Sequence, residues 1–160
     1  LLVTHDPEEA MSICDKVAVM NEGKIHQIDS PIKLLENPKT LFVSSFILGN
    51  NIINLKKNGE AYSSSVGEIN TLDLREKKLF EFLSISPKFI SIKKSKDGDA
   101  IVLSKEFLGE YFMYKLCVND ETIRVRTNIN NIFNIGDKCS LSINKESFCF
   151  LYPGGYKLSI

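Results

Sequence analysis

The chain has 160 residues, 43% of them hydrophobic, which is enough to bury the core of one ordinary domain or of two small ones. Its 20 basic residues balance its 20 acidic residues, so overall charge indicates neither a polyanion nor an anionic membrane as a partner. No apolar stretch approaches the roughly 20 residues of a transmembrane helix. The sequence starts at Leu1 without a methionine, a basic segment or a cleavage site, and we expect that an N-terminal part is missing.

The first predicted elements are a short strand and a helix that meet at His5. Residues 1–3 are apolar and predict the strand. Asp6 can cap the first backbone N–H groups of a helix, and Glu9 stands at the spacing of a capping box. We expect this helix to end near Asp15.

A hairpin and two short helices are predicted next. Residues 17–20 and 24–28 are expected to pair across a turn that contains a glycine. Residues 30–35 begin with a serine cap and a proline, which predicts a short helix. A second helix is predicted over residues 40–47, and Gly49 followed by two asparagines marks a domain boundary.

The remainder of the chain predicts short β-strands separated by glycine, asparagine and aspartate. The predicted strands cover residues 51–56, 60–66, 79–93, 100–107, 111–118, 122–127, 138–150 and 156–160. We therefore expect a mostly β protein, in which an OB-like β-barrel over residues 50–160 follows an α/β segment over residues 1–49. The four cysteines form no CxxC pair, which favours buried small side chains in a reduced chain, and they stand at positions 14, 117, 139 and 149.

One long motif runs through the first fifty residues. VTHDPEEAM at residues 3–11 is followed by DKVAVMNEGKI at residues 15–25 and by QIDSP at residues 27–31. This stretch resembles the C-terminal end of the ATPase domain of ABC transporters. In that family the histidine at the position of His5 is the H-loop residue, which contacts the γ-phosphate of ATP. The resemblance therefore makes His5 the catalytic and cofactor-binding candidate.

The chemistry of phosphoryl transfer agrees with this role, because it depends on positioned donors that neutralise charge on the transferred group. A lone loop histidine is more often a surface or structural residue, and only the surrounding motif favours catalysis for His5. Asp6 has the simpler interpretation of a helix cap. His26 has no second ligand at metal spacing, so we predict a solvent-facing strand residue there and no metal site.

The second part of the chain resembles TOBE domains, the OB-fold-like regulatory modules that follow the ATPase domain in importers of ions, sugars, polyamines and oxyanions. The resemblance rests on FLGEY at residues 107–111, IRVR at 123–126 and IGDK at 135–138. It also includes Ser-Pro-Lys at residues 86–88, where the family has Arg-Pro-Glu. Because two charged residues differ there, no ligand role is carried over to this tripeptide.

Several motifs of an ABC ATPase are absent from this sequence. None of the nine glycines begins a GxxxxGK[ST] phosphate loop, and neither an LSGGQ-like signature nor a Walker B Asp-Glu pair is present. The resemblance implies that the complete subunit is an ATPase that uses ATP and Mg²⁺, whereas this chain alone is predicted to be inactive. It also implies a homodimer, transmembrane permease subunits as partners, and a cytoplasmic location at the inner face of the membrane. The FLGE stretch favours ferric iron or a polyamine as solute, with sugars and sulfate still open.

Two other functions are compatible with parts of the sequence. The chain could be a free-standing OB-fold-like binding module that keeps a non-catalytic ATPase remnant, and sequence upstream of Leu1 would distinguish the two. Arg124 and Arg126 share one side of a strand near aromatic residues, as in nucleic-acid-binding barrels, but alternation is typical of any half-buried strand. We therefore predict no nucleic-acid partner. The lysines and aspartates over residues 93–99 predict a solvated turn.

Overall fold

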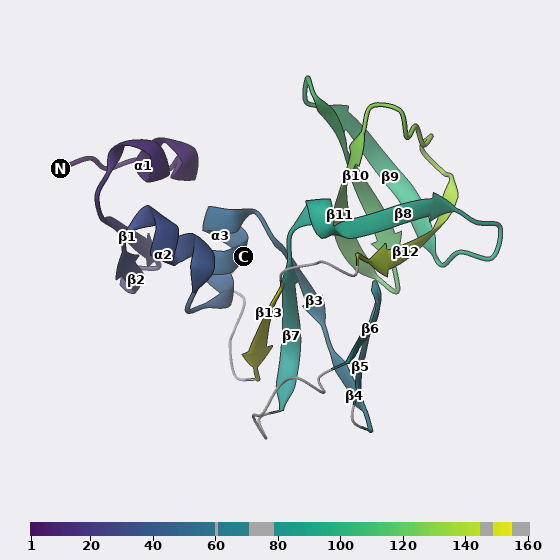
Figure 1. The fold of residues 1–160 in the computed structure, drawn as a ribbon, viewed down its shortest axis with the longest axis horizontal. Coiled ribbons are helices and arrows are strands. Elements are labelled where there is room, and N and C mark those ends of the chain that lie inside the picture. Colours follow the sequence, from purple (N-terminus) through teal and green to yellow (C-terminus); the bar gives the residue numbers. More distant parts are fainter. Residues whose placement is uncertain (60, 71–78, 145–148, 155–160) are drawn as a thin grey trace. The chain divides into compact units, whose positions relative to one another are not determined.

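The computed structural model describes residues 1–59, 61–70, 79–144 and 149–154 (Figure 1). These residues form two compact units, an N-terminal unit of residues 1–50 and a β unit of residues 51–154. Within the described part of the chain, no helix is long and apolar enough to cross a membrane. That the two units are the end of an ATPase domain and a TOBE domain stays a prediction.

The N-terminal unit contains three short helices and one antiparallel hairpin. Its elements are α1 (Pro7–Ile13), β1 (Val17–Asn21), β2 (Lys24–Asp29), α2 (Pro31–Glu36) and α3 (Leu41–Leu48). Its small core gathers Val17 and Val19 from β1, Leu34 from α2 and Val43 from α3. The predicted hairpin and helices are therefore confirmed.

Local signals explain where the helices of this unit begin and end. The Asp6 carboxylate accepts hydrogen bonds from the backbone N–H groups of Glu8 and Glu9, as the sequence predicts for a cap of α1. The Thr40 hydroxyl caps α3 by accepting from the N–H of Val43 at 3.2 Å. Gly49 ends α3 with φ +61°, a left-handed conformation that glycine adopts without steric cost.

The strand predicted over residues 1–3 is wrong. The side chains of Leu1, Leu2 and Val3 are exposed, and no strand in the described part of the chain pairs with them. An extended apolar run becomes a strand only when a neighbour supplies the ladder of hydrogen bonds.

The β unit is built from antiparallel strands in three sheets. In chain order its elements are β3 (Asn51–Asn54), β4 (Lys56–Asn58), β5 (Ala61–Ser64), β6 (Gly67–Asn70), β7 (Phe80–Ile85), the 3-10 turn η1 (Pro87–Phe89), β8 (Ile90–Lys94), β9 (Ala100–Phe107), β10 (Tyr111–Val118), β11 (Glu121–Asn128), β12 (Lys138–Ile143) and β13 (Cys149–Pro153). The strand orders are β11-β10-β9-β12-β8, β13-β7-β3 and β4-β5-β6. The prediction of a mostly β fold is confirmed, although the strands that the structure describes do not close into a barrel.

Four predicted strands are interrupted or shortened in the structure, and the first of them, 51–56, is split at Leu55 between β3 and β4. The run 79–93 is broken by η1, because Pro87 has no backbone N–H to continue a ladder and begins a 3-10 turn. The run 60–66 ends in a turn after Ser64, and β6 follows it. The run 138–150 is covered by β12 and the start of β13, with residues 145–148 outside the described residues, as is the predicted strand 156–160.

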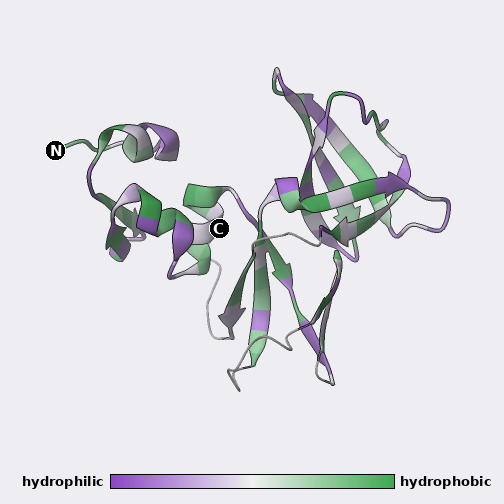
Figure 2. Cartoon of the chain, in the orientation of Figure 1, coloured by the Kyte–Doolittle hydropathy of each residue, from purple (hydrophilic) through white to green (hydrophobic). Residues whose placement is uncertain are grey.

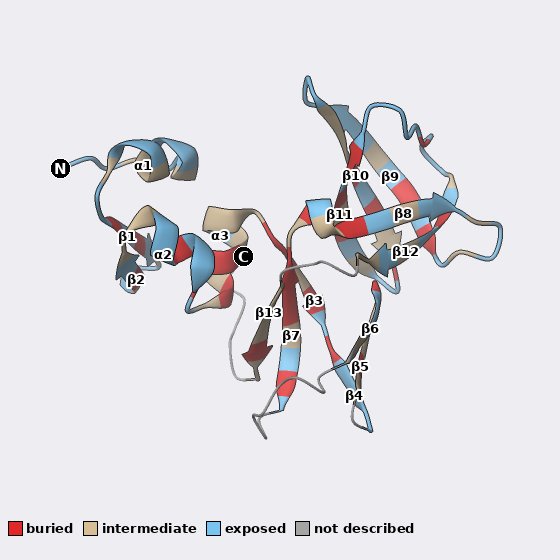
Figure 3. Cartoon of the chain, in the orientation of Figure 1, coloured by how far each residue is buried: buried red, intermediate tan, exposed pale blue. Residues whose placement is uncertain are grey.

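One hydrophobic core joins the three sheets of the β unit. Apolar and polar residues alternate along its strands (Figure 2), and in β11 the residues Ile123, Val125 and Thr127 face inward. Buried positions lie on strands throughout the β unit (Figure 3). The core includes side chains from all three sheets, among them Ile53 of β3 and Leu116 of β10. The inward-facing rows of the strands therefore hold the sheets together.

A buried asparagine side chain links β3 to β11. The Asn51 side chain is 4% exposed. Its Nδ2 donates to the carbonyl oxygen of Arg124 at 2.8 Å, and its Oδ1 accepts from the N–H of Arg124 at 2.8 Å. The amide thus satisfies one donor and one acceptor at the edge of the five-stranded sheet, as a neighbouring strand would.

We expect Asn51→Ala to destabilise the β unit by about 1–3 kcal/mol, because it removes the two hydrogen bonds that the buried Asn51 amide makes with the backbone of Arg124. Urea unfolding followed by circular dichroism measures this change. Asn58→Ala on β4 is the matched control, since the Asn58 side chain is exposed, and it should change stability by less than about 0.5 kcal/mol. Equal effects of the two substitutions would contradict the role of Asn51.

Candidate functional site

His5 lies in the segment that leads into α1. Its side chain is exposed and makes no hydrogen bond within the described part of the chain. The segment itself is held in place, because the Asp6 N–H donates to the Thr4 hydroxyl at 3.1 Å and the Asp6 carboxylate caps α1. Both ring nitrogens of His5 are thus available to a ligand, while Asp6 is engaged as a cap.

A groove of the N-terminal unit surrounds His5. Its wall is formed by residues 1–7, Ala10, Ile13, residues 14–20, Phe46 and Ile47. Most of these side chains are apolar, and Leu1 and Val3 are largely exposed. Contiguous exposed apolar surface of this kind marks an interaction site, so the groove around His5 is suited to packing against further polypeptide.

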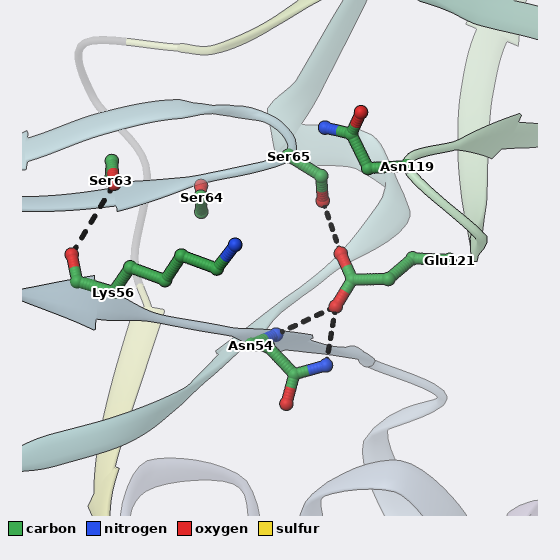
Figure 4. Close-up of a pocket in the computed structure, with 7 residues that line it drawn as sticks. All are labelled: Asn54, Lys56, Ser63, Ser64, Ser65, Asn119 and Glu121. Carbon is green, nitrogen blue, oxygen red and sulfur yellow. Dashed lines mark hydrogen bonds between the residues drawn. The ribbon is translucent and has the colours of Figure 1, made fainter.

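A second site, in the β unit, is centred on Glu121 (Figure 4). Its Oε1 accepts from the backbone N–H of Asn54 at 3.0 Å and from Asn54 Nδ2 at 2.6 Å, and its Oε2 accepts from the Ser65 hydroxyl at 2.5 Å. The carboxylate thereby ties together β3, the β5–β6 turn and the start of β11. Three donors already occupy it, which favours a structural role over binding of a ligand.

The remaining lining of this pocket is entirely polar. Lys56 extends into it, with no ion pair to any residue that the structure describes, and Asn119 lies at the rim with φ +49°. The other lining residues are Ser63 and Ser64, whose hydroxyls donate to the carbonyl oxygens of Lys56 and Gly67. The pocket thus offers one cation and several hydrogen-bonding groups but no apolar wall, unlike most small-molecule sites.

The two arginines of β11 lie on the opposite face of the sheet from two of the three aromatic residues of β10, the neighbouring strand. The Arg126 guanidinium stacks 3.8 Å from the ring centre of Tyr111, on the outer face of β10 and β11. Tyr114 is fully buried and Phe112 packs against the core on the other face. A continuous aromatic platform for nucleic-acid bases is therefore not formed.

His26 and Lys94, two further residues considered from the sequence, contact other residues of the protein. His26 is half-buried, not solvent-facing as predicted, because its Nδ1 lies 3.2 Å from the Thr40 hydroxyl and its ring packs 5.0 Å from that of Phe42. Lys94 forms an ion pair with Asp137 at 2.7 Å. The Asn134 N–H, and then Lys94, lower the pKa of the Asp137 carboxyl.

The cysteines agree only in part with the prediction of buried small side chains. All four are free, but only Cys139 is fully buried, and the other three are partly exposed. Burial raises the pKa of the Cys139 and Cys149 thiols, which favours their neutral, unreactive form.

Several curated proteins similar to the chain are described as spermidine/putrescine import ATP-binding proteins. No family model matches it. The spermidine/putrescine import ATP-binding protein PotA of Mesoplasma florum is 32% identical over 154 residues, which cover 92% of this chain and 43% of the relative. PotA of Bacillus anthracis is 55% identical over 62 residues, or 39% of this chain and 18% of the relative. PotA of Trichormus variabilis is 54% identical over 52 residues, or 32% and 14%.

The chain is related to the ATP-binding subunits of ABC importers. The resemblance that the sequence motifs indicate, to the C-terminal part of such a subunit, is thereby confirmed. The chain spans less than half the length of each of these relatives. The activity, solute and partners of a complete importer subunit are consequently proposals for this chain.

The sequence motif makes His5 a candidate, whereas no pattern in the sequence indicates the Glu121 site. His5 stands within a motif of consecutive residues, which is the kind of signal that one sequence can carry. Glu121, by contrast, contacts Asn54 and Ser65 across 67 and 56 residues of sequence. The sequence places Ser65 in the strand predicted over residues 60–66 and does not indicate this contact.

We expect Glu121→Ala to lower the stability of the β unit by about 1–3 kcal/mol, because it removes the acceptor shared by three donors. Thermal and urea unfolding measure the loss. Glu106→Ala makes the same chemical change at an exposed position of β9 and should be nearly neutral. A Glu121→Ala protein as stable as the Glu106→Ala protein would show that the three contacts are not stabilising.

Proposed function

We propose that the chain is the C-terminal part of the ATP-hydrolysing subunit of an ABC importer, and that it couples ATP hydrolysis to solute import. The observation that carries this proposal is the similarity to the PotA protein of Mesoplasma florum over 92% of the chain. In this proposal the N-terminal unit ends the ATPase domain, and the β unit is a TOBE-type module for regulation and dimerisation.

His5 is proposed to be the H-loop residue of that subunit. Its exposed ring has no competing partner in the described residues and can donate a hydrogen bond to a phosphate oxygen. The segment that carries it is held by the Asp6 cap of α1, and the carboxylates of Asp6, Glu8 and Glu9 offset the dipole of the helix start. A donor fixed in this way neutralises charge on the transferred phosphoryl group without reorganisation.

The residues present fit only one part of an ATP–Mg²⁺ site. His5 can contact the terminal phosphate, but the nearby Asp6 carboxylate is engaged in capping, and the sequence contains no phosphate loop. ATP would supply the phosphoryl group and Mg²⁺ the charge neutralisation when bound to the complete subunit. We therefore propose that binding and hydrolysis need residues outside this chain, which the apolar groove around His5 is suited to contact.

The solute and the partners are also part of the proposal. The relatives are described as spermidine/putrescine importers, which favours a polyamine over ferric iron, sugars or sulfate. We propose a homodimer of the subunit, bound to transmembrane permease subunits at the cytoplasmic face of the membrane. Uptake of labelled spermidine by cells with and without the encoding gene tests the solute.

In the complete subunit we expect His5→Ala to lower kcat for ATP hydrolysis by about 100-fold or more, as loss of one positioned donor to a developing anion does. ATP affinity should change far less, since other motifs would hold the triphosphate. Phosphate-release kinetics and nucleotide-binding titrations separate the two effects.

His26→Asn is the control for this substitution, because it changes the other histidine and keeps a polar group near Thr40. It should retain kcat within a few-fold. Unchanged hydrolysis in the His5→Ala subunit would overturn the H-loop assignment.

We expect the 160-residue chain alone to show no ATP binding at micromolar concentration and no hydrolysis, because its sequence has no phosphate loop. Isothermal titration calorimetry with Mg-ATP measures this directly. Micromolar binding would show that this chain holds a nucleotide site of its own.

A further inference from the structure

Thr4 lies directly before His5, in the wall of the same groove. It is half-buried, whereas His5 and Asp6 are exposed. The Thr4 hydroxyl oxygen accepts a hydrogen bond from the Asp6 N–H at 3.1 Å. This bond joins the two neighbours of His5 and closes a tight turn with His5 at its centre, a local contact that threonine hydroxyls make to the backbone two residues on. The backbone of His5 is therefore restrained from both sides.

Asp6 connects this turn to α1. Its Oδ1 accepts hydrogen bonds from the N–H groups of Glu8 at 2.8 Å and Glu9 at 3.3 Å. Its carbonyl oxygen accepts from the Ala10 N–H at 3.3 Å, as the residue that caps a helix does for the first intrahelical bond. Asp6 thus donates to Thr4 on one side and accepts from the first turn of α1 on the other.

The helix in turn packs against the core of the N-terminal unit. Ala10 and Met11 of α1, and Cys14 directly after it, are partly buried against that core. His5 is therefore connected to the core through Asp6 and α1, and Thr4 adds the contact on its other side. The hydrogen bonds between Thr4 and Ala10 all join residues close in sequence, so they form without residues outside this chain.

We propose that Thr4 is a positioning residue for His5, whose hydroxyl fixes the backbone of His5 and thereby the place at which the imidazole meets the terminal phosphate. This inference rests on the proposed H-loop role of His5, and it adds a residue that acts through His5 and not on ATP itself. A misplacement of about 1 Å can cost about 100-fold in rate. Added backbone freedom at His5 should therefore slow hydrolysis, whereas binding of the triphosphate depends on other residues.

Kinetics of the complete subunit with Thr4→Val test the proposal, because valine keeps the branched shape of the side chain and removes the hydroxyl. We expect kcat for ATP hydrolysis to fall by about 5- to 20-fold, and the dissociation constant for ATP to stay within about twofold. Thr4→Ser keeps the hydroxyl and should restore kcat to within about twofold of the unchanged subunit.

Ser12→Ala is the matched control. The Ser12 hydroxyl donates to the carbonyl oxygen of Glu9 at 3.0 Å, so this substitution also removes a local hydroxyl hydrogen bond of α1, but at the far end of the helix from His5. It should leave kcat within about twofold, as expected of an exposed position outside the site. A loss of kcat equal to that of Thr4→Val would show that the helix, and not the position of His5, is what both hydroxyls affect.

The double variant His5→Ala/Thr4→Val separates positioning from an independent role. If Thr4 acts only through His5, its substitution should change kcat by less than about twofold once the imidazole is absent. A further fall as large as that caused by Thr4→Val alone would overturn the inference. An unchanged kcat in the Thr4→Val subunit would overturn it as well.

A second measurement needs no variant, and it decides the case in which Thr4→Val fails to fold. In the unchanged 160-residue chain, nitrogen-15 relaxation should give the His5 amide an order parameter near that of rigid backbone, about 0.85. A value below about 0.6 would show that the Thr4 hydroxyl does not hold His5 in place.

Failure of this inference and failure of the proposed function give different results. If His5→Ala leaves hydrolysis unchanged, the H-loop assignment is wrong and the role of Thr4 is wrong with it. If His5→Ala slows hydrolysis and Thr4→Val does not, only the role of Thr4 is wrong.

Discussion

Two side-chain contacts between β3 and β11 set the register between the three-stranded sheet that contains β3 and the five-stranded sheet. Asn51 contacts Arg124 through two hydrogen bonds, and three residues later Asn54 contacts Glu121 through two more. As β3 advances from Asn51 to Asn54, its contact on β11 shifts back from Arg124 to Glu121, which is the register of an antiparallel pair. Side chains therefore replace the backbone ladder where the two sheets meet, and the edge of β11 is protected.

The parts of the structure that the sequence predicts are those that depend on neighbouring residues. Asp6, Thr40 and Gly49 determine helix ends through contacts within a few residues, so a single sequence reveals them. The strand predicted over residues 1–3 was wrong because a strand depends on a partner strand, and the local sequence pattern does not specify that partner. The Asn51 contact spans 73 residues, and no local pattern in the sequence indicates it.

The candidate sites also combine features that the sequence indicates with contacts that only the structure shows. His5 could be assigned from its flanking motif, but its place beside an apolar groove emerges only from the structure. In contrast, the arginines of β11 follow the predicted alternation, and yet Arg126 covers the ring of Tyr111. A pattern of residues thus indicates which side chains share a face, whereas their contacts decide whether that face can bind a ligand.

Tyr114 connects the core of the β unit to its exposed loop. Its ring is fully buried, so its hydroxyl needs hydrogen-bonding partners, and the loop backbone supplies them through the Phe133 N–H and the Asn131 carbonyl oxygen. The same contacts anchor the centre of the loop between β11 and β12. Satisfying one buried hydroxyl therefore also attaches this loop to the core of the β unit.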